Sequence, residues 1–119
     1  MHNYNVLEKR PELKALLEEV KERTTILIGN KLKQIILFGS FARGEEKQGS
    51  DIDIMLLIDE GREEIEKYGE DILDIMTDLS LKYDVVLSIL EVSVQDYNKY
   101  KEFIPFYENV SYEGVEIYG

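Results

Sequence analysis

The sequence predicts an α/β (or α+β) fold in which a small mixed β-sheet is flanked by helices. Two observations predict this class. Segments with apolar residues at helical spacing alternate with short runs rich in branched residues, and no Gly-, Ser- or Pro-rich linker separates them. The length of 119 residues and the hydrophobic content of 44% suit one core but not two independent ones. We therefore expect a single domain over residues 1–119.

The first expected elements are a helix and a strand. Pro11 is tolerated at the first turn of a helix, and apolar residues at helical spacing follow it to about Gly29. The run Gln34–Phe38 is short and rich in branched residues, and Gly39-Ser40 follows it directly. This pattern is typical of a buried strand that enters a tight turn.

Residues 51–58 form the second expected strand. Side chains alternate between the two faces of a strand, so the isoleucines and Leu56 fall on one face while Asp51 and Asp53 fall on the other. Two carboxylates are therefore expected to project from the same side of this strand.

The rest of the chain is expected to add two helices, a third strand and two short terminal segments. The helices lie at about residues 60–81 and 93–101, and the strand lies at residues 84–90. The terminal segments are a helical turn at 105–107 and residues 115–117. Ser93, followed three residues later by Asp96, resembles a helix start with an acidic side chain where a capping box carries Glu or Gln.

Charge and composition exclude several function classes. The chain carries 25 acidic and 14 basic side chains, a net charge of −11, whereas coating of nucleic acid or docking on anionic lipid requires clustered positive charge. Apolar runs such as residues 54–58 are far shorter than the roughly 20 residues that span a bilayer. With no recognisable secretory signal and no cysteine, we expect a cytoplasmic protein without membrane or general nucleic-acid binding.

The Gly-Ser turn is a candidate phosphate site. A strand that ends in Gly39-Ser40 and runs into a short helix at residues 41–43 leaves backbone N–H groups and a hydroxyl without partners. Gly39 lets the backbone approach an anion closely. A Gly-Ser pair alone is common in turns, so the interpretation depends on the residues downstream of the turn.

Asp51 and Asp53 are candidate metal ligands. Two carboxylates two residues apart on a strand can bind Mg²⁺, a hard cation that takes oxygen ligands and is typically shared with substrate phosphates. Because the protein is acidic, its overall field repels a nucleotide triphosphate, and the carboxylates need the cation to convert repulsion into binding. Together with Gly39 and Ser40 they predict a site for Mg²⁺ and a nucleotide.

Asp84 is the candidate for a third catalytic and metal-binding carboxylate, which in metal-assisted phosphoryl transfer helps to align the attacking hydroxyl. It stands at the expected start of the third strand, with Ser88 four residues on, on the same face. The alternative is that Asp84 accepts backbone N–H bonds at a junction between helix and strand.

Two further residues are candidates for nucleotide binding. Arg43 can reach a phosphate oxygen from the short helix, and Ser50 can position the loop before the aspartates. In the alternative interpretation, Arg43 pairs with a nearby acid such as Glu45 or Glu46.

The string GSFARGEEKQGSDIDIMLL resembles the signature of the minimal nucleotidyltransferases of the DNA polymerase β superfamily. The match consists of Gly39-Ser40, ten intervening residues and Asp51-Ile52-Asp53. The resemblance implies the polymerase β-like fold, a Gly-Ser turn that holds the triphosphate, and aspartates that ligate Mg²⁺. It implies transfer of a nucleoside monophosphate, usually AMP from ATP, to an acceptor with release of pyrophosphate. A third acid in the pattern Asp-apolar-apolar is matched by Asp84 if the strand begins there; otherwise Ser88 takes that place.

Small members of this family also imply a partner. They are commonly encoded beside a helical HEPN-type RNase toxin and act as its antitoxin, some by attaching AMP to a tyrosine of the toxin. The alternative is an interaction module that neutralises its partner by binding, with a vestigial metal site. A catalytic domain that needs a second subunit is a further alternative, and the oligomeric state, a homo-oligomer included, stays open.

Overall fold

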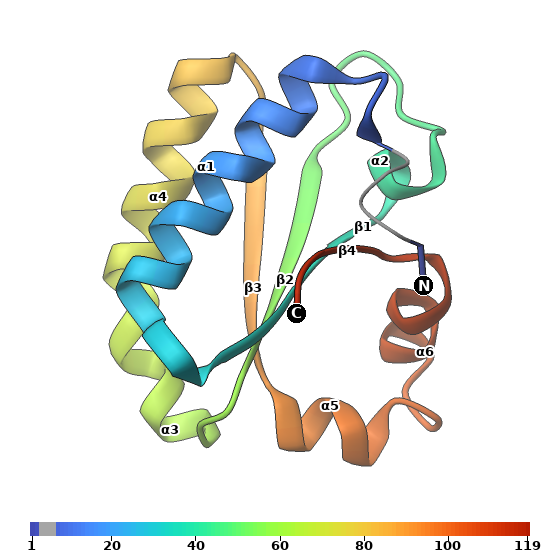
Figure 1. The fold of residues 1–119 in the computed structure, drawn as a ribbon. Helices are drawn as coiled ribbons and strands as arrows, with labels where there is room; N and C mark the ends of the chain where they lie inside the picture. The colour runs from blue at the N-terminus through green and yellow to red at the C-terminus, as the bar shows by residue number, and fades with distance from the viewer. Residues whose placement is uncertain (3–6) are drawn as a thin grey trace.

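A computed structural model of the chain describes residues 1–2 and 7–119. Its centre is a sheet of four strands, β1 (Leu32–Phe38), β2 (Ile52–Ile58), β3 (Leu87–Ser93) and β4 (Val115–Tyr118). The strand order is β3-β2-β1-β4 (Figure 1). β1 pairs antiparallel with β2 and β4, whereas β2 pairs parallel with β3. The predicted small mixed sheet is therefore confirmed.

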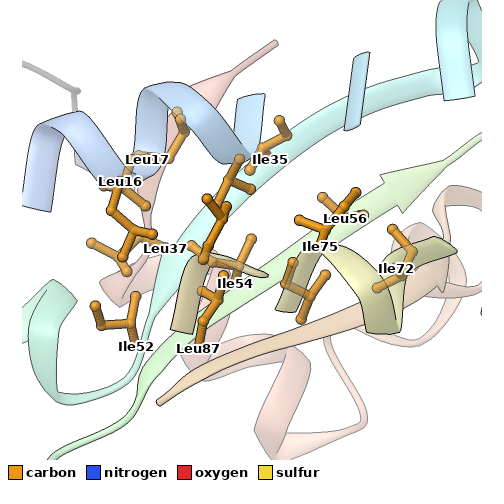
Figure 2. Packing of buried hydrophobic residues seen from close by; sticks show 14 of the residues in the cluster. Leu16, Leu17, Ile35, Leu37, Ile52, Ile54, Leu56, Ile72, Ile75 and Leu87 are labelled. Atoms are coloured by element: carbon orange, nitrogen blue, oxygen red, sulfur yellow. The ribbon is translucent and has the colours of Figure 1, made fainter. Parts of the chain in front are cut away.

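Two long helices, α1 (Pro11–Ile28) and α4 (Gly69–Tyr83), cover one face of this sheet (Figure 1). The larger part of the hydrophobic core lies between them and the strands. Leu17, Ile54 and Ile72 come from helix, strand and helix in turn and are fully buried there (Figure 2). The alternation predicted for residues 51–58 thus directs the isoleucines toward the helices.

The opposite face is covered in part by two shorter helices, α5 (Val94–Tyr100) and α6 (Pro105–Glu113). A second, smaller cluster joins them to the sheet, and it includes Met55, Leu57 and Tyr97. The proline at the start of α6 stands where a helix tolerates it. This last helix is longer than the single turn expected from the sequence.

The long helix expected over residues 60–81 is interrupted. The chain instead forms two short elements before α4, namely α3 (Arg62–Ile65) and η3 (Glu66–Tyr68). Two other short helical elements of the described residues are η2 (Gly29–Lys31) and α2 (Ser40–Arg43). The carboxylate of Glu60 accepts hydrogen bonds from Lys67, at 2.7 Å, and from Tyr68. These bonds hold the tighter turn of η3, and Gly69 lowers helix propensity at the break.

The third strand begins later than expected. α4 continues to Tyr83, and Asp84 ends it in the left-handed conformation with φ of 53°. β3 therefore starts at Leu87 and not at Asp84. Within the described residues, no helix is long and apolar enough to cross a membrane.

Candidate functional site

The Gly-Ser turn joins β1 to α2. Gly39 follows the last residue of β1 with φ of 77°, a backbone conformation that side chains rarely adopt. The N–H groups of Ala42 and Arg43 donate to the Gly39 carbonyl at 3.1 and 3.2 Å, which closes the turn. The N–H groups of Ser40 and Phe41 have no acceptor within so short a helix.

Asp53 packs directly against this turn. It stands opposite Phe38 in the antiparallel pairing of β1 and β2. A Cβ atom placed on Gly39 would lie 2.5 Å from Oδ2 of Asp53, much closer than a real contact allows. The dihedral angle of Gly39 therefore favours glycine, and a side chain at this position would have to displace the carboxylate of Asp53.

The two aspartates differ in environment. Asp51 is exposed and immediately precedes β2, whereas Asp53 is half-buried on the face that carries Met55. Burial and, next, the charge of Asp51 raise the pKa of Asp53, while the charge of Arg43 lowers it. A raised pKa means that the negative charge is poorly stabilised by the protein alone. A carboxylate in this state, with a second carboxylate two residues away, suits a hard cation that takes further ligands from phosphate, as Mg²⁺ does.

Ser50 orders the loop before the aspartates. Its hydroxyl accepts a hydrogen bond from the Lys47 N–H at 2.9 Å, and its own N–H donates to the Lys47 carbonyl at 3.0 Å. The reciprocal pair closes a tight turn directly before Asp51. The structure thus gives Ser50 a role in positioning this loop.

Arg43 is engaged by two carboxylates. Its Nε donates to Glu45 at 2.6 Å and its Nη1 to Glu113 at 3.2 Å, and both pairs are largely exposed. These hydrogen bonds raise the pKa of Arg43, with Glu45 as the larger cause. Arg43 therefore pairs with a nearby acidic residue, Glu45, as the alternative interpretation of the sequence expects.

Asp84 is not brought into a three-carboxylate set. It is the exposed residue that ends α4, and its N–H donates to the Ser80 carbonyl. The residue that stands beside Asp53 in the parallel pairing with β3 is Ser88. Among residues 1–2 and 7–119, no group of three or more His, Asp or Glu side chains is arranged to hold a metal. The expectation that the strand begins at Asp84 is wrong, because β3 begins at Leu87. The alignment that placed Asp84 beside Asp51 and Asp53 is therefore wrong as well.

A cavity of about 210 Å³ adjoins the turn, and it is lined in part by residues that the sequence analysis did not identify as site candidates. Its lining combines the end of β1, the turn and α2 with residues of α6, namely Phe38, Gly39, Arg43, Phe106, Asn109, Val110 and Glu113. Glu113 lies 70 positions from its partner Arg43, so no local pattern could have predicted the contact. A larger hollow of about 500 Å³, lined in part by Leu13 and Tyr83, contains none of the predicted site residues.

The mixed sheet, the Gly-Ser turn and the aspartate beside it define the nucleotidyltransferase class. The chain belongs to the nucleotidyltransferase domain family, whose profile matches residues 13–113. The resemblance and the fold class predicted from the sequence are thereby confirmed, and the protein is a nucleotidyltransferase.

Two similar proteins from Methanocaldococcus jannaschii carry the provisional name of protein adenylyltransferases. One is 36% identical over 77 residues, which cover 65% of this chain and 76% of the relative. The other is 39% identical over 88 residues, which cover 74% of this chain and 80% of the relative.

Solved structures share the fold. A toxin-antitoxin crystal structure with AMP-PNP aligns with a TM-score of 0.53 at 19% identity and covers 87% of this chain and 73% of that chain. A structure of a tri-AMPylated Shewanella oneidensis HEPN toxin in complex with MNT antitoxin aligns with a TM-score of 0.50 at 19% identity. It covers 89% of this chain and 72% of that chain.

Proposed function

We propose that the protein transfers AMP from ATP, with Mg²⁺, to a hydroxyl group of a partner protein, and that this acceptor is a tyrosine of a HEPN-type toxin. In this role the chain is an antitoxin of the cytoplasm. The names of the Methanocaldococcus jannaschii relatives support protein adenylylation. The toxin-antitoxin complexes that share the fold support the choice of partner.

One observation carries the proposal: the carboxylate of Asp53 touches the glycine of the Gly-Ser turn. A group that binds phosphate and a group that binds a cation support each other when they are adjacent, because a bound cation would offset the negative charge of both the carboxylate and the phosphate. The contact between Gly39 and Asp53 provides this adjacency. Ser40 supports it, since its hydroxyl has no hydrogen-bond partner within the described residues.

The proposed chemistry is an in-line displacement. The acceptor oxygen forms a bond to the α-phosphorus of ATP, the bond from that phosphorus to the bridging oxygen breaks, and pyrophosphate leaves while the hydroxyl proton is released. Asp51 and Asp53 would hold the cation, and Gly39 and Ser40 would hold the phosphates. Bound Mg²⁺ would neutralise charge on the attacking and leaving oxygens.

The test is label transfer. The full chain is incubated with ATP labelled at the α-phosphate, MgCl₂ and a HEPN-type protein, and the labelled product is resolved on a denaturing gel. Transfer that is lost in Asp51→Asn and Asp53→Asn but kept in Asp74→Asn supports the proposal, since Asp74 is an exposed residue of α4. Transfer that survives both site variants contradicts it.

A second candidate function is neutralisation of the partner by binding alone. The observation that favours it is the serine, not an acid, that stands beside Asp53 on β3. A toxin assay separates the two functions. Neutralisation that persists in Asp51→Asn and Asp53→Asn, without label transfer by the unmodified chain, favours binding alone.

A further inference from the structure

Arg43, the last residue of α2, forms ion pairs with two carboxylates. Glu45 holds Nε from the neighbouring loop, and Glu113 holds Nη1 from the last residue of α6. The cavity of about 210 Å³ beside Gly39 is lined by both Arg43 and Glu113, and Arg43 is the basic residue of that lining. Arg43 therefore lines the same cavity as the glycine of the turn.

The charges around this space are unfavourable for a polyanion. Asp51, Asp53, Glu45 and Glu113 contribute negative charge, and Arg43 opposes them with a single positive charge that reaches Asp53 strongly enough to affect its ionisation. A guanidinium pairs with phosphate and carboxylate through the same planar donors. A phosphate next to Gly39 and the carboxylate of Glu113 must therefore compete for Arg43.

We propose that Glu113 is an internal competitor of the nucleotide: its carboxylate pairs with Nη1 of Arg43, and the terminal phosphates of a nucleoside triphosphate displace it from that nitrogen. The inference rests on the proposed nucleotide site and adds its regulation. Both side chains are about two-fifths exposed, so the pair is weak and can be replaced by a more highly charged anion. A nucleoside monophosphate, which has no terminal phosphates, leaves the pair in place.

Calorimetric titration tests the competition. AMP-PNP and AMP, each with MgCl₂, are titrated into the full chain as the unmodified protein, Glu113→Gln and Glu108→Gln. Glu108 is an exposed residue of the same helix and provides the matched loss of one negative charge. We expect Glu113→Gln to lower the Kd of AMP-PNP roughly two- to fivefold, the range of an exposed ion pair, and to leave the Kd of AMP unchanged.

A double-mutant cycle completes the test. Arg43→Gln should weaken AMP-PNP binding and remove the benefit of Glu113→Gln, because the competition requires the guanidinium. An unchanged or higher Kd in Glu113→Gln, an equal gain for AMP, or an equal gain in Glu108→Gln overturns the inference while the proposed function stands. Absence of AMP-PNP binding by the unmodified chain overturns the proposed function and the inference together.

Discussion

Gly39 and Asp53 depend on each other at the scale of single residues. The glycine has φ of 77° and ψ of −158°, a region of backbone conformation that other residues rarely occupy. The carboxylate of Asp53 fills the space where a side chain at position 39 would be. A substitution at either position therefore changes the other one.

Gly39→Ala should lower the free energy of unfolding by about 1–3 kcal/mol and abolish binding of AMP-PNP, because the new methyl group displaces Asp53. Gly29→Ala is the control. Gly29 has a similar backbone with φ of 72° and ψ of −144°, and nothing lies within 4 Å of an added Cβ. It should cost a similar amount of stability and leave binding intact. Denaturant unfolding and calorimetry measure the two effects, and equal loss of binding in both variants contradicts the argument.

The pKa of Asp53, which burial and Asp51 raise, predicts a pH dependence of stability. As pH rises above about 4, an unfolded Asp releases its proton first, and the folded protein follows at a higher pH and at a cost. Asp53 thus lowers the free energy of unfolding least at low pH, where it is protonated in both states. Its contribution to stability falls as pH rises through the raised pKa. Without metal, Asp53→Asn should gain more stability over the unmodified chain at pH 7 than at pH 4.

Urea unfolding in EDTA at the two pH values measures this difference. Asp74→Asn, at an exposed position, controls for the general loss of acid and should show a smaller change with pH. Excess MgCl₂ should remove most of the gain in Asp53→Asn, because the cation stabilises the charged carboxylate. A gain that is larger at pH 4 would contradict the assigned direction.

Ser88→Asp should strengthen metal binding. Ser88 stands beside Asp53 in the parallel pairing and is exposed, and neighbouring strands are about 4.8 Å apart. A third carboxylate there would add an oxygen ligand and more negative charge at the cation. We expect the affinity for Mn²⁺, measured by calorimetry, to rise several-fold, with Ser88→Asn as the uncharged control. An affinity equal to that of Ser88→Asn would show that position 88 does not reach the cation.

At the scale of elements, the sequence predicted what depends on local patterns. Pro11 and the helical spacing after it predicted α1, and the alternation over residues 51–58 predicted that the isoleucines share one face of β2, which the structure places under α1 and α4. Asp84-Val85-Val86 has the composition of a strand, yet α4 runs on to Tyr83 and Asp84 ends it. The start of β3 is set by the length of a helix packed in tertiary structure, which a local pattern does not contain.

The candidate site divides in the same way. The spacing between Gly39-Ser40 and Asp51-Ile52-Asp53 predicted that the first pair forms a turn after one strand and that the aspartates belong to the next strand. The ion pair of Arg43 with Glu113 links residues 70 positions apart through the packing of α6 on β1. Contacts of this kind follow from the assembled fold, because the neighbourhood of Glu113 does not distinguish it from the many other acidic residues of the chain.

The packing of α4 predicts a contrast between adjacent residues. Ile72 is fully buried against the sheet, whereas Leu73 is 58% exposed. Ile72→Ala should lower the free energy of unfolding by about 2–5 kcal/mol, because it leaves a cavity in the core. Leu73→Ala should change it by no more than about 0.5 kcal/mol. Thermal and urea unfolding measure both, and similar losses would show that the outer side of α4 is also packed.

At the scale of the whole molecule, the net charge of −11 opposes the approach of a nucleotide. Salt screens this long-range repulsion. The association rate constant of AMP-PNP, measured by stopped flow with a fluorescent analogue and constant MgCl₂, should therefore increase from low to moderate NaCl. A rate that falls with salt would indicate that local attraction by Arg43 outweighs the field of the whole chain.

The helices that cover the two faces of the sheet are expected to differ in how much their mutation destabilises the fold. The face under α1 and α4 contains most of the buried aliphatic residues, while the face under α5 and α6 contains a small cluster and the turn that Asp53 touches. Random mutagenesis of residues 94–113, followed by selection for solubility, should accordingly yield far more survivors than mutagenesis of residues 11–28. Such a library would let an engineer vary the surroundings of the reaction while the scaffold continues to assemble.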